Sequence, residues 1–161
     1  MNKAYYLIVT IIALIGILVI LYVTRFGAGV SPDSVYYISG ARNLVNSNSY
    51  LNFFGEPMTD WPPLFSFLIS AISYFNMDTA EAARFLNSVT FGLNIFLMGI
   101  LFYKVTNKSF LYSVLGILIF ATSVDMYQIH RMVWSEPFFI SLLLSWILIY
   151  NAFIEKQSIG F

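Results

Sequence analysis

Residues 4–24 read AYYLIVTIIALIGILVILYVT and contain no charged side chain. A helix of about 20 apolar residues is long enough to cross the hydrocarbon core of a bilayer. The apolar part of this stretch is also longer than the roughly 7 to 15 residues of a signal-peptide core. The stretch therefore predicts an uncleaved membrane anchor.

Three further stretches also lack charged residues. They are residues 85–103, 109–124 and 137–154, which contain 19, 16 and 18 residues. Each is near the lower or middle part of the range of about 17 to 25 residues that a spanning helix needs. Residues 64–75 form a shorter run of 12 after Pro62 and Pro63. A run of this length is typical of a helix that lies at the membrane interface or re-enters the membrane against protein.

The predicted fold is an all-α integral membrane protein with one membrane domain over residues 1–161. We expect four transmembrane helices at about 4–24, 82–103, 109–124 and 137–154, with outer loops at 25–81 and 125–136. The first loop holds a predicted amphipathic surface helix at 34–46, because apolar residues recur there at steps of three and four. The short run at 64–75 adds the re-entrant or interfacial helix.

The composition excludes several other classes of protein. Hydrophobic residues make up 59% of the chain and charged residues 10%, against about 25% charged in a soluble domain, and the mean hydropathy is +0.78. Such a chain is neither a water-soluble nor a disordered protein. Its net charge of zero argues against a nucleic-acid partner, and the lack of cysteine excludes disulfides and thiol chemistry.

The lysines predict the topology. With four spans and a cytoplasmic amino terminus, all four lysines fall on the cytoplasmic side, as the positive-inside rule requires; they are Lys3, Lys104, Lys108 and Lys156. The outer side receives the four arginines and seven of the eight acids. We therefore expect a multi-pass protein, located in the plasma membrane if the organism is prokaryotic.

The first outer loop contains candidate functional residues with two interpretations each. Asp33 precedes the predicted surface helix and is either a helix N-cap or a carboxylate fixed as a base at the membrane surface. Asp60 precedes Pro62 and is likewise either a helix cap or part of a site. Arg84 enters a span, where a charge is costly, so it holds either a ligand or an acidic partner such as Asp33, Asp60 or Glu81.

The second outer loop carries a dense polar cluster of Asp125, His130, Arg131 and Glu136. Glu136 heads an apolar helix, yet it faces the same compartment as Asp33 and Asp60, so three acids from separate segments can converge. His130 stands alone and is a weak candidate metal ligand. Asn87 and Asn94 are seven residues apart on one helix face and are expected to bond helix to helix.

A set of short motifs resembles a known family. The motifs are Asp33-Ser34-Val35-Tyr36-Tyr37, Ala41-Arg42-Asn43-Leu44, Gly55, Trp61-Pro62-Pro63-Leu64, Ala82-Ala83-Arg84 and Trp134-Ser135-Glu136-Pro137. In order, spacing and predicted side they resemble the amino-terminal third of membrane glycosyltransferases of the GT-C fold. Within this fold, the motifs are similar to those of protein O-mannosyltransferases and aminoarabinose transferases, which use polyprenyl-phosphate sugars.

The resemblance implies roles for individual residues. Asp33 matches the loop carboxylate regarded as the catalytic base, and Glu136 matches a second-loop acid that faces the active site. Arg84 matches an arginine implicated in binding the donor phosphate, and Asp60 an acid that some relatives use to bind a metal. Trp61 replaces the lysine or histidine of those families, which leaves the phosphate contact at this position open.

The expected function is transfer of a sugar from a polyprenyl-phosphate donor to a protein, lipid or glycan acceptor, with inversion and general-base assistance. Arg84 and Arg131 are the predicted cations for the leaving phosphate. Tyr36, Tyr37 and Trp61 are predicted to contact the substrate, and a divalent metal ion is the one cofactor that the resemblance allows.

Two further expectations accompany this reading. Members of the fold run to about ten or more spans, so the chain resembles a fragment of a longer transferase. The alternative function is a small non-catalytic membrane subunit, or an inactive fragment, whose loop charges only pair at the interface. The two readings differ over Asp33 and Glu136, which matter for transfer but not for a subunit.

Overall fold

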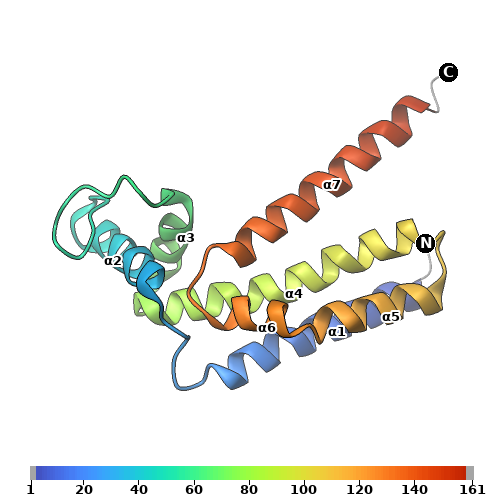
Figure 1. Cartoon of the computed structure of the whole chain (residues 1–161), viewed down its shortest axis with the longest axis horizontal. Helices are drawn as coiled ribbons and strands as arrows, with labels where there is room; N and C mark the ends of the chain where they lie inside the picture. The colour runs from blue at the N-terminus through green and yellow to red at the C-terminus, as the bar shows by residue number, and fades with distance from the viewer. Residues whose placement is uncertain (1–2, 159–161) are drawn as a thin grey trace.

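The computed structural model describes residues 3–158, and all of the secondary-structure elements named within them are α-helices (Figure 1). In chain order the helices are α1 (Lys3–Val23), α2 (Pro32–Ser47), α3 (Pro63–Ser73), α4 (Thr79–Val105), α5 (Phe110–Ala121), α6 (Val124–Arg131) and α7 (Glu136–Ser158). The prediction of an all-helical chain is therefore confirmed, and α2 and α3 coincide with the surface helix and the short apolar helix expected in the first outer loop.

Three helices are long and apolar enough to cross a membrane: α1, α4 and α7. They match three of the predicted spans. The fourth, predicted as one helix at 109–124, is wrong in detail, because α5 ends at Ala121 and α6 begins at Val124 at an angle of 49° to it and continues into the predicted second outer loop. The break falls at Thr122 and Ser123, and Ser123 has the extended backbone of the α6 N-cap. Only if this bent pair is counted as one span does the number reach four.

The long helices form a bundle around α4. Helices α1, α5, α6 and α7 all pack on α4, although α7 diverges from it along its length (Figure 1). The contact between α1 and α4 is close because a glycine lies in it: a Cβ at Gly92 would lie 2.9 Å from the Ala13 carbonyl oxygen. Small residues let the backbones of two helices come close together. This packing matters in a membrane because the hydrophobic effect does not drive helices together there.

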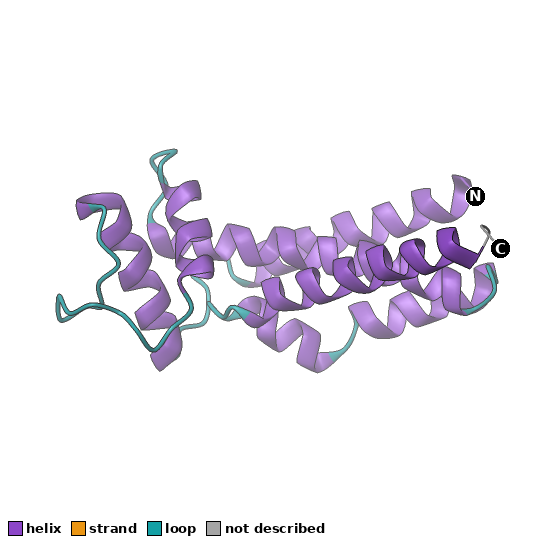
Figure 2. Cartoon of the chain, turned by 90° about the horizontal axis from the view of Figure 1, so that it is seen from above, coloured by secondary structure: helices purple, strands orange, loops and turns teal. Residues whose placement is uncertain are grey.

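The remaining elements form a separate unit at one end of the bundle, which we call the head: α2, the 48–62 loop and α3 (Figures 1 and 2). Helices α2 and α3 pack on each other and on the first turns of α4. Their buried side chains form one apolar cluster with Val133 from the segment before α7. With 27 residues, α4 is about 40 Å long, which exceeds the roughly 30 Å of a bilayer core and leaves its first turns for the head.

The four lysines lie at the end of the molecule opposite the head. Both described chain ends are at that end in Figures 1 and 2, as is the turn between α4 and α5. Lys104, in the last turn of α4, pairs there with Glu155 of α7, with Nζ 3.1 Å from the carboxylate. This segregation agrees with the predicted charge asymmetry; which end faces the cytoplasm remains a prediction.

Candidate functional site

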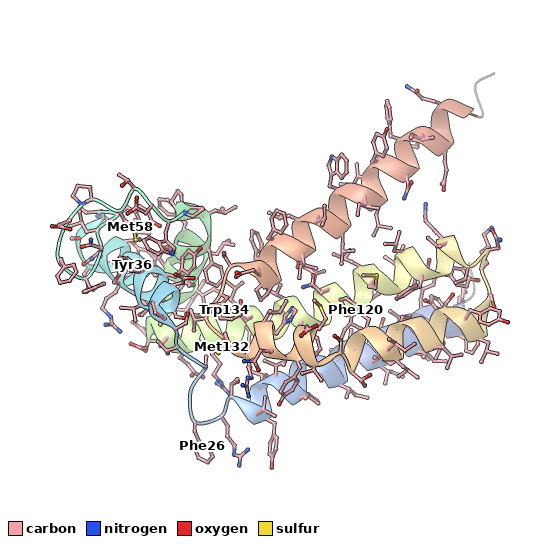
Figure 3. The ribbon with its side chains drawn as sticks, in the orientation of Figure 1. Phe26, Tyr36, Met58, Phe120, Met132 and Trp134 are labelled. Carbon is pink, nitrogen blue, oxygen red and sulfur yellow. The ribbon has the colours of Figure 1, made fainter. Side chains whose placement is uncertain are left out.

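The two predicted outer loops join each other where the head meets the bundle. The Gly29 amide donates to the Arg131 carbonyl at 2.8 Å, and the Val133 amide donates to the Gly29 carbonyl at 3.0 Å, so the backbones pair as an isolated parallel bridge. Beside this bridge, the Trp134 indole nitrogen donates to the Ser31 hydroxyl at 2.7 Å. Figure 3 shows Met132 and Trp134 in this joint.

A pair of hydroxyl groups extends the joint to the candidate acids. The Tyr37 hydroxyl lies 3.0 Å from the Ser135 hydroxyl. Tyr37 is one helical turn after Asp33 in α2, and Ser135 directly precedes Glu136, the first residue of α7. The contact therefore brings the starts of α2 and α7 together, and with them the two carboxylates that the sequence singled out. We call Asp33, Tyr37, Ser135 and Glu136 the paired-acid site.

The pKa of the Tyr37 hydroxyl is affected by both acids. Burial raises the pKa of Tyr37 above its ordinary value, and the hydrogen bond with Ser135 acts in the opposite direction. The negative charges of Glu136 and then Asp33 add to the rise of this pKa. Both directions agree with the chain positions of the acids, since Asp33 lies one turn before Tyr37 on α2 and Glu136 follows Ser135. The segments that carry Asp33 and Glu136 thus meet, while a convergence of three acids that includes Asp60 stays a prediction.

Asp33 does not have the capping role that was one of its two interpretations. The N-cap of α2 is Ser31, whose hydroxyl accepts from the Ser34 amide, while the Ser34 hydroxyl accepts from the Ser31 amide. This capping box satisfies the orphan amides, and Asp33 is left in the first turn. Its side chain is exposed and takes part in none of the hydrogen bonds or ion pairs found within residues 3–158. Glu136 is exposed in the same way.

Buried hydrogen bonds from two asparagines of α4 hold the segments on either side of Ser135 and Glu136. The Asn87 amide nitrogen donates to the Met132 carbonyl at 2.6 Å, which fixes the segment before Trp134. The Asn94 amide nitrogen donates to the Pro137 carbonyl at 2.9 Å, and its oxygen accepts from the Ser141 hydroxyl at 2.6 Å. Asn94 therefore bonds helix to helix, as predicted, whereas Asn87 bonds α4 to the segment between α6 and α7.

His130 belongs to this network. It is 1% exposed, and its Nε2 lies 3.0 Å from the Asn94 amide nitrogen while its Nδ1 lies 2.6 Å from the Met126 carbonyl oxygen. Both ring nitrogens are engaged, so His130 holds α6 against α4. The weak metal-ligand interpretation of His130 is not supported by this geometry.

The arginines that were candidates for phosphate binding differ in their surroundings. Arg84 donates from Nε to the Thr24 hydroxyl at 3.1 Å and from Nη2 to the Leu21 carbonyl at 2.8 Å, and its Nη1 pairs with Glu81. Arg84 thus connects the end of α1 to α4. This agrees with the alternative interpretation, in which Arg84 has an acidic partner, and that partner is Glu81. Arg131 has an exposed side chain that makes no such contact within residues 3–158.

Asp60 does not have the capping role that was one of its two interpretations, because the N-cap position of α3 is Pro62 and no side chain bonds to it. Asp60 is exposed, and within the described part of the chain no three His, Asp or Glu side chains gather to hold a metal ion. Its metal-binding role remains a prediction.

Trp61 and Tyr36 are joined to each other. Their rings stack with centroids 3.9 Å apart and planes 8° apart, and the Tyr50 hydroxyl donates to the Trp61 carbonyl at 3.0 Å. The stack fixes the start of α3 against α2, and Figure 3 shows Tyr36 within the head. The two rings therefore have a structural role, and their contact with a substrate stays a prediction.

An apolar groove opens beside the paired-acid site, between the first turns of α3 and α7. Its volume is about 170 Å³, and it is lined by Pro62, Leu64, Phe65, Ser135, Phe138, Phe139 and Leu142. Ser135 is its polar residue and adjoins Glu136, while the α7 residues continue into the candidate span. This α3–α7 groove is thus an apolar hollow next to the acid at the start of α7.

Sequence reasoning missed Ser31 and Ser135 as site-building residues, as well as the groove. A signal for Ser31 was present, because serine followed by proline and then by a second serine at the third position is typical of a helix start. Ser135 and the groove depend on contacts across about one hundred residues of chain, as in the Tyr37–Ser135 separation of 98, and no local pattern announces them.

Comparison of the chain with protein-family models, with curated proteins and with solved structures found no match in any of the three.

Proposed function

We propose that the protein is a membrane glycosyltransferase of the GT-C type, which moves a sugar from a polyprenyl-phosphate donor to an acceptor at the head end of the bundle. The observation that carries the proposal is the paired-acid site: two exposed carboxylates, at the starts of helices far apart in sequence, flank the Tyr37–Ser135 contact, and Ser135 also lines an apolar groove. The motif resemblance of the sequence supports the same reading.

The residues can be assigned to a balanced reaction. An acceptor hydroxyl oxygen forms the new bond to the anomeric carbon while the bond from that carbon to the phosphate oxygen breaks. The Asp33 carboxylate takes the hydroxyl proton, which is the work of a general base open to water. Glu136 on the opposite loop orients the acceptor or the sugar hydroxyls. The polyprenyl phosphate leaves as an anion.

The groove and the arginines serve the donor. The isoprenoid chain lies in the α3–α7 groove, whose walls are apolar apart from Ser135, so the phosphate would emerge at the Ser135 end of the groove. Arg131, exposed beside the loop joint, is the better candidate for charge stabilisation. Arg84 is the weaker candidate because its Nε, Nη1 and Nη2 all donate hydrogen bonds to protein groups.

The non-catalytic subunit is the less favoured function. It requires that the loop charges pair with each other, and three ion pairs do occur within residues 3–158: Arg42 with Asp78, Arg84 with Glu81 and Lys104 with Glu155. Asp33 and Glu136 are in none of them. A purely structural role leaves unexplained why the acids at the joined starts of α2 and α7 are both without an ion pair within residues 3–158.

Photolabelling tests the donor assignment. The protein is reconstituted in lipid nanodiscs with a polyprenyl phosphate that carries a diazirine near its phosphate end, and a diazirine phosphatidylcholine serves as the control lipid. We expect the polyprenyl probe to label Leu64, Phe138 or Phe139 in excess over the control lipid. Equal labelling by both lipids, spread along the exposed face of α7, would contradict a donor groove.

A further inference from the structure

A second hollow lies in the head, away from the paired-acid site. Its volume is about 400 Å³, within the range of about 300–1,000 Å³ of small-molecule sites, and its walls come from α2 and from the turn of the 48–62 loop. The lining residues are Ser39, Arg42, Asn43, Asn52, Phe53, Phe54 and Gly55. We call it the head hollow.

The walls of the head hollow are fixed by their own hydrogen bonds. The Asn52 side-chain oxygen accepts from the amides of Phe54 and Glu56 at 2.9 and 3.0 Å, and Gly55 has a φ of +81°, which favours glycine. The Asn43 amide nitrogen donates to the carbonyls of Leu51 and Asn52 at 2.9 and 3.1 Å. The turn is thus held against α2, and a ligand would meet a preformed surface.

Polar groups and ring faces remain available on these walls. The Arg42 side chain is 55% exposed, and its guanidinium lies 3.7 Å from the Asp78 carboxylate, a loose surface pair. The Asn43 side-chain oxygen accepts no hydrogen bond from residues 3–158. Phe54 is 72% exposed and Phe53 is 50% exposed, with their ring centroids 4.1 Å apart.

This mixture favours one class of ligand. A pyranose has hydroxyl groups around its rim, which pair with a guanidinium and an amide oxygen, and an apolar C–H face, which packs on an aromatic ring. A lipid chain would leave Arg42 and Asn43 unsatisfied, at a cost in free energy. A phosphate or carboxylate would meet the Glu56 carboxylate, which accepts from the Asn52 amide nitrogen at 3.3 Å beside the hollow.

The position of the hollow also favours a ligand from water. The 48–62 loop lies at the end of the head farthest from the candidate spans in Figures 1 and 2. Arg42 follows Asp33 by nine residues along α2, a rise of about 14 Å. The hollow is therefore separate from the paired-acid site but on the same helix.

We propose that the head hollow binds a neutral pyranose, with Arg42 and Asn43 on its hydroxyl groups and Phe54 against its C–H face. Binding of this sugar needs no transfer activity, so the site stands apart from the proposed function. If transfer also holds, the distance along α2 makes the hollow a subsite for a sugar remote from the reacting end of a glycan acceptor.

Saturation-transfer NMR tests the site directly. The protein is placed in lipid nanodiscs without glycoside detergents, and the probes are methyl α-D-mannopyranoside, methyl β-D-glucopyranoside and sodium D-glucuronate. Tetraethylene glycol serves as a probe that has oxygen atoms but no pyranose face. We expect saturation of the C–H protons of at least one neutral glycoside and none of tetraethylene glycol. Absence of saturation for both neutral glycosides at millimolar concentrations would overturn the proposal, as would a stronger signal from glucuronate.

Matched variants assign the contact to the hollow. Phe54→Leu should weaken glycoside binding about fivefold, the effect of one aromatic contact, and Arg42→Gln should weaken it as well. The controls are Phe75→Leu and Arg25→Gln, which change an exposed phenylalanine and an exposed arginine outside the hollow. Unfolding temperatures show whether each variant is folded. Equal binding by the wild type and both hollow variants would place the sugar elsewhere and overturn the assignment.

Discussion

The hydroxyl groups of Tyr37 and Ser135 lie 3.0 Å apart although the residues are 98 positions apart in the chain. The contact joins the residue before α7 to the second turn of α2, and so connects the helix starts that carry Asp33 and Glu136. The relative position of these helix starts is held by this pair of hydroxyls together with the Trp134–Ser31 bond and the Gly29 backbone bridge.

The Tyr37–Ser135 contact should be measurable as a coupling energy. Tyr37→Phe and Ser135→Ala are each expected to lower the free energy of unfolding by about 1 kcal/mol, the net value of one hydrogen bond. The double variant should be less destabilised than the sum of the two single variants. The measurement is chemical unfolding of all four proteins in detergent, and simple additivity of the two changes would show that the hydroxyls do not bond.

The ionisation of Tyr37 gives a prediction with a definite sign. Burial, followed by the charges of Glu136 and Asp33, raises the pKa of Tyr37 above 10.0, whereas the unfolded chain ionises near that value. The native state therefore retains its phenol proton longer, and its stability from Tyr37 declines as the pH rises above about 10. The difference in absorbance at 295 nm between wild type and Tyr37→Phe should titrate above pH 10; a midpoint at or below 10 would contradict the burial.

Arg84 should behave as a structural residue. Arg84→Gln removes the guanidinium bonds to Thr24 and Leu21 and the pair with Glu81, and we expect a loss of about 2 kcal/mol in unfolding free energy. Arg42→Gln, which breaks an exposed pair, should cost less than about 1 kcal/mol. Thermal unfolding compares the two variants. Unchanged stability of Arg84→Gln, with weaker binding of polyprenyl phosphate, would instead identify Arg84 as a ligand of the donor.

The buried network under the site should be more costly to disturb than surface amides. Asn94→Ala deprives the Ser141 hydroxyl and the Pro137 carbonyl of their partner, and a loss of about 1–2 kcal/mol is expected, as for polar contacts between membrane helices. The matched control is Asn46→Ala, because Asn46 is exposed on α2. Equal unfolding temperatures for the two variants would show that the network does not hold α7.

The helices could be predicted from sequence because their signals are local. An uncharged stretch of sufficient length indicates a spanning helix whatever surrounds it, which explains the agreement for α1, α4 and α7. The same rule failed at 109–124, since Thr122 and Ser123 do not interrupt the apolar run although the helix breaks there. Hydropathy averages over a window of residues and does not register the extended backbone of one of them.

The site could be predicted only in part. Asp33 and Glu136 were found as acids at helix starts, yet the sequence could not distinguish a cap from an exposed carboxylate, because Ser31 and Asp33 both lie at the start of α2 and either can cap. The roles of Tyr37, Ser135 and the α3–α7 groove rest on packing between distant segments. Arg84 was correctly recognised as a charge that needs a partner, and Glu81 was among the partners named.

The most direct measurement is donor consumption by membranes that carry the full-length protein. The donors are polyprenyl-phosphate mannose and polyprenyl-phosphate aminoarabinose, cell-envelope extract supplies the acceptor, and the released polyprenyl phosphate is quantified. Wild-type membranes should consume one donor, and Asp33→Asn and Glu136→Gln should each lower the rate by at least about a hundredfold, as expected for a general base and its partner. Asp125→Asn, at an exposed acid of α6, should leave the rate unchanged. A wild-type rate for Asp33→Asn, or consumption of neither donor by the wild type, would contradict the account.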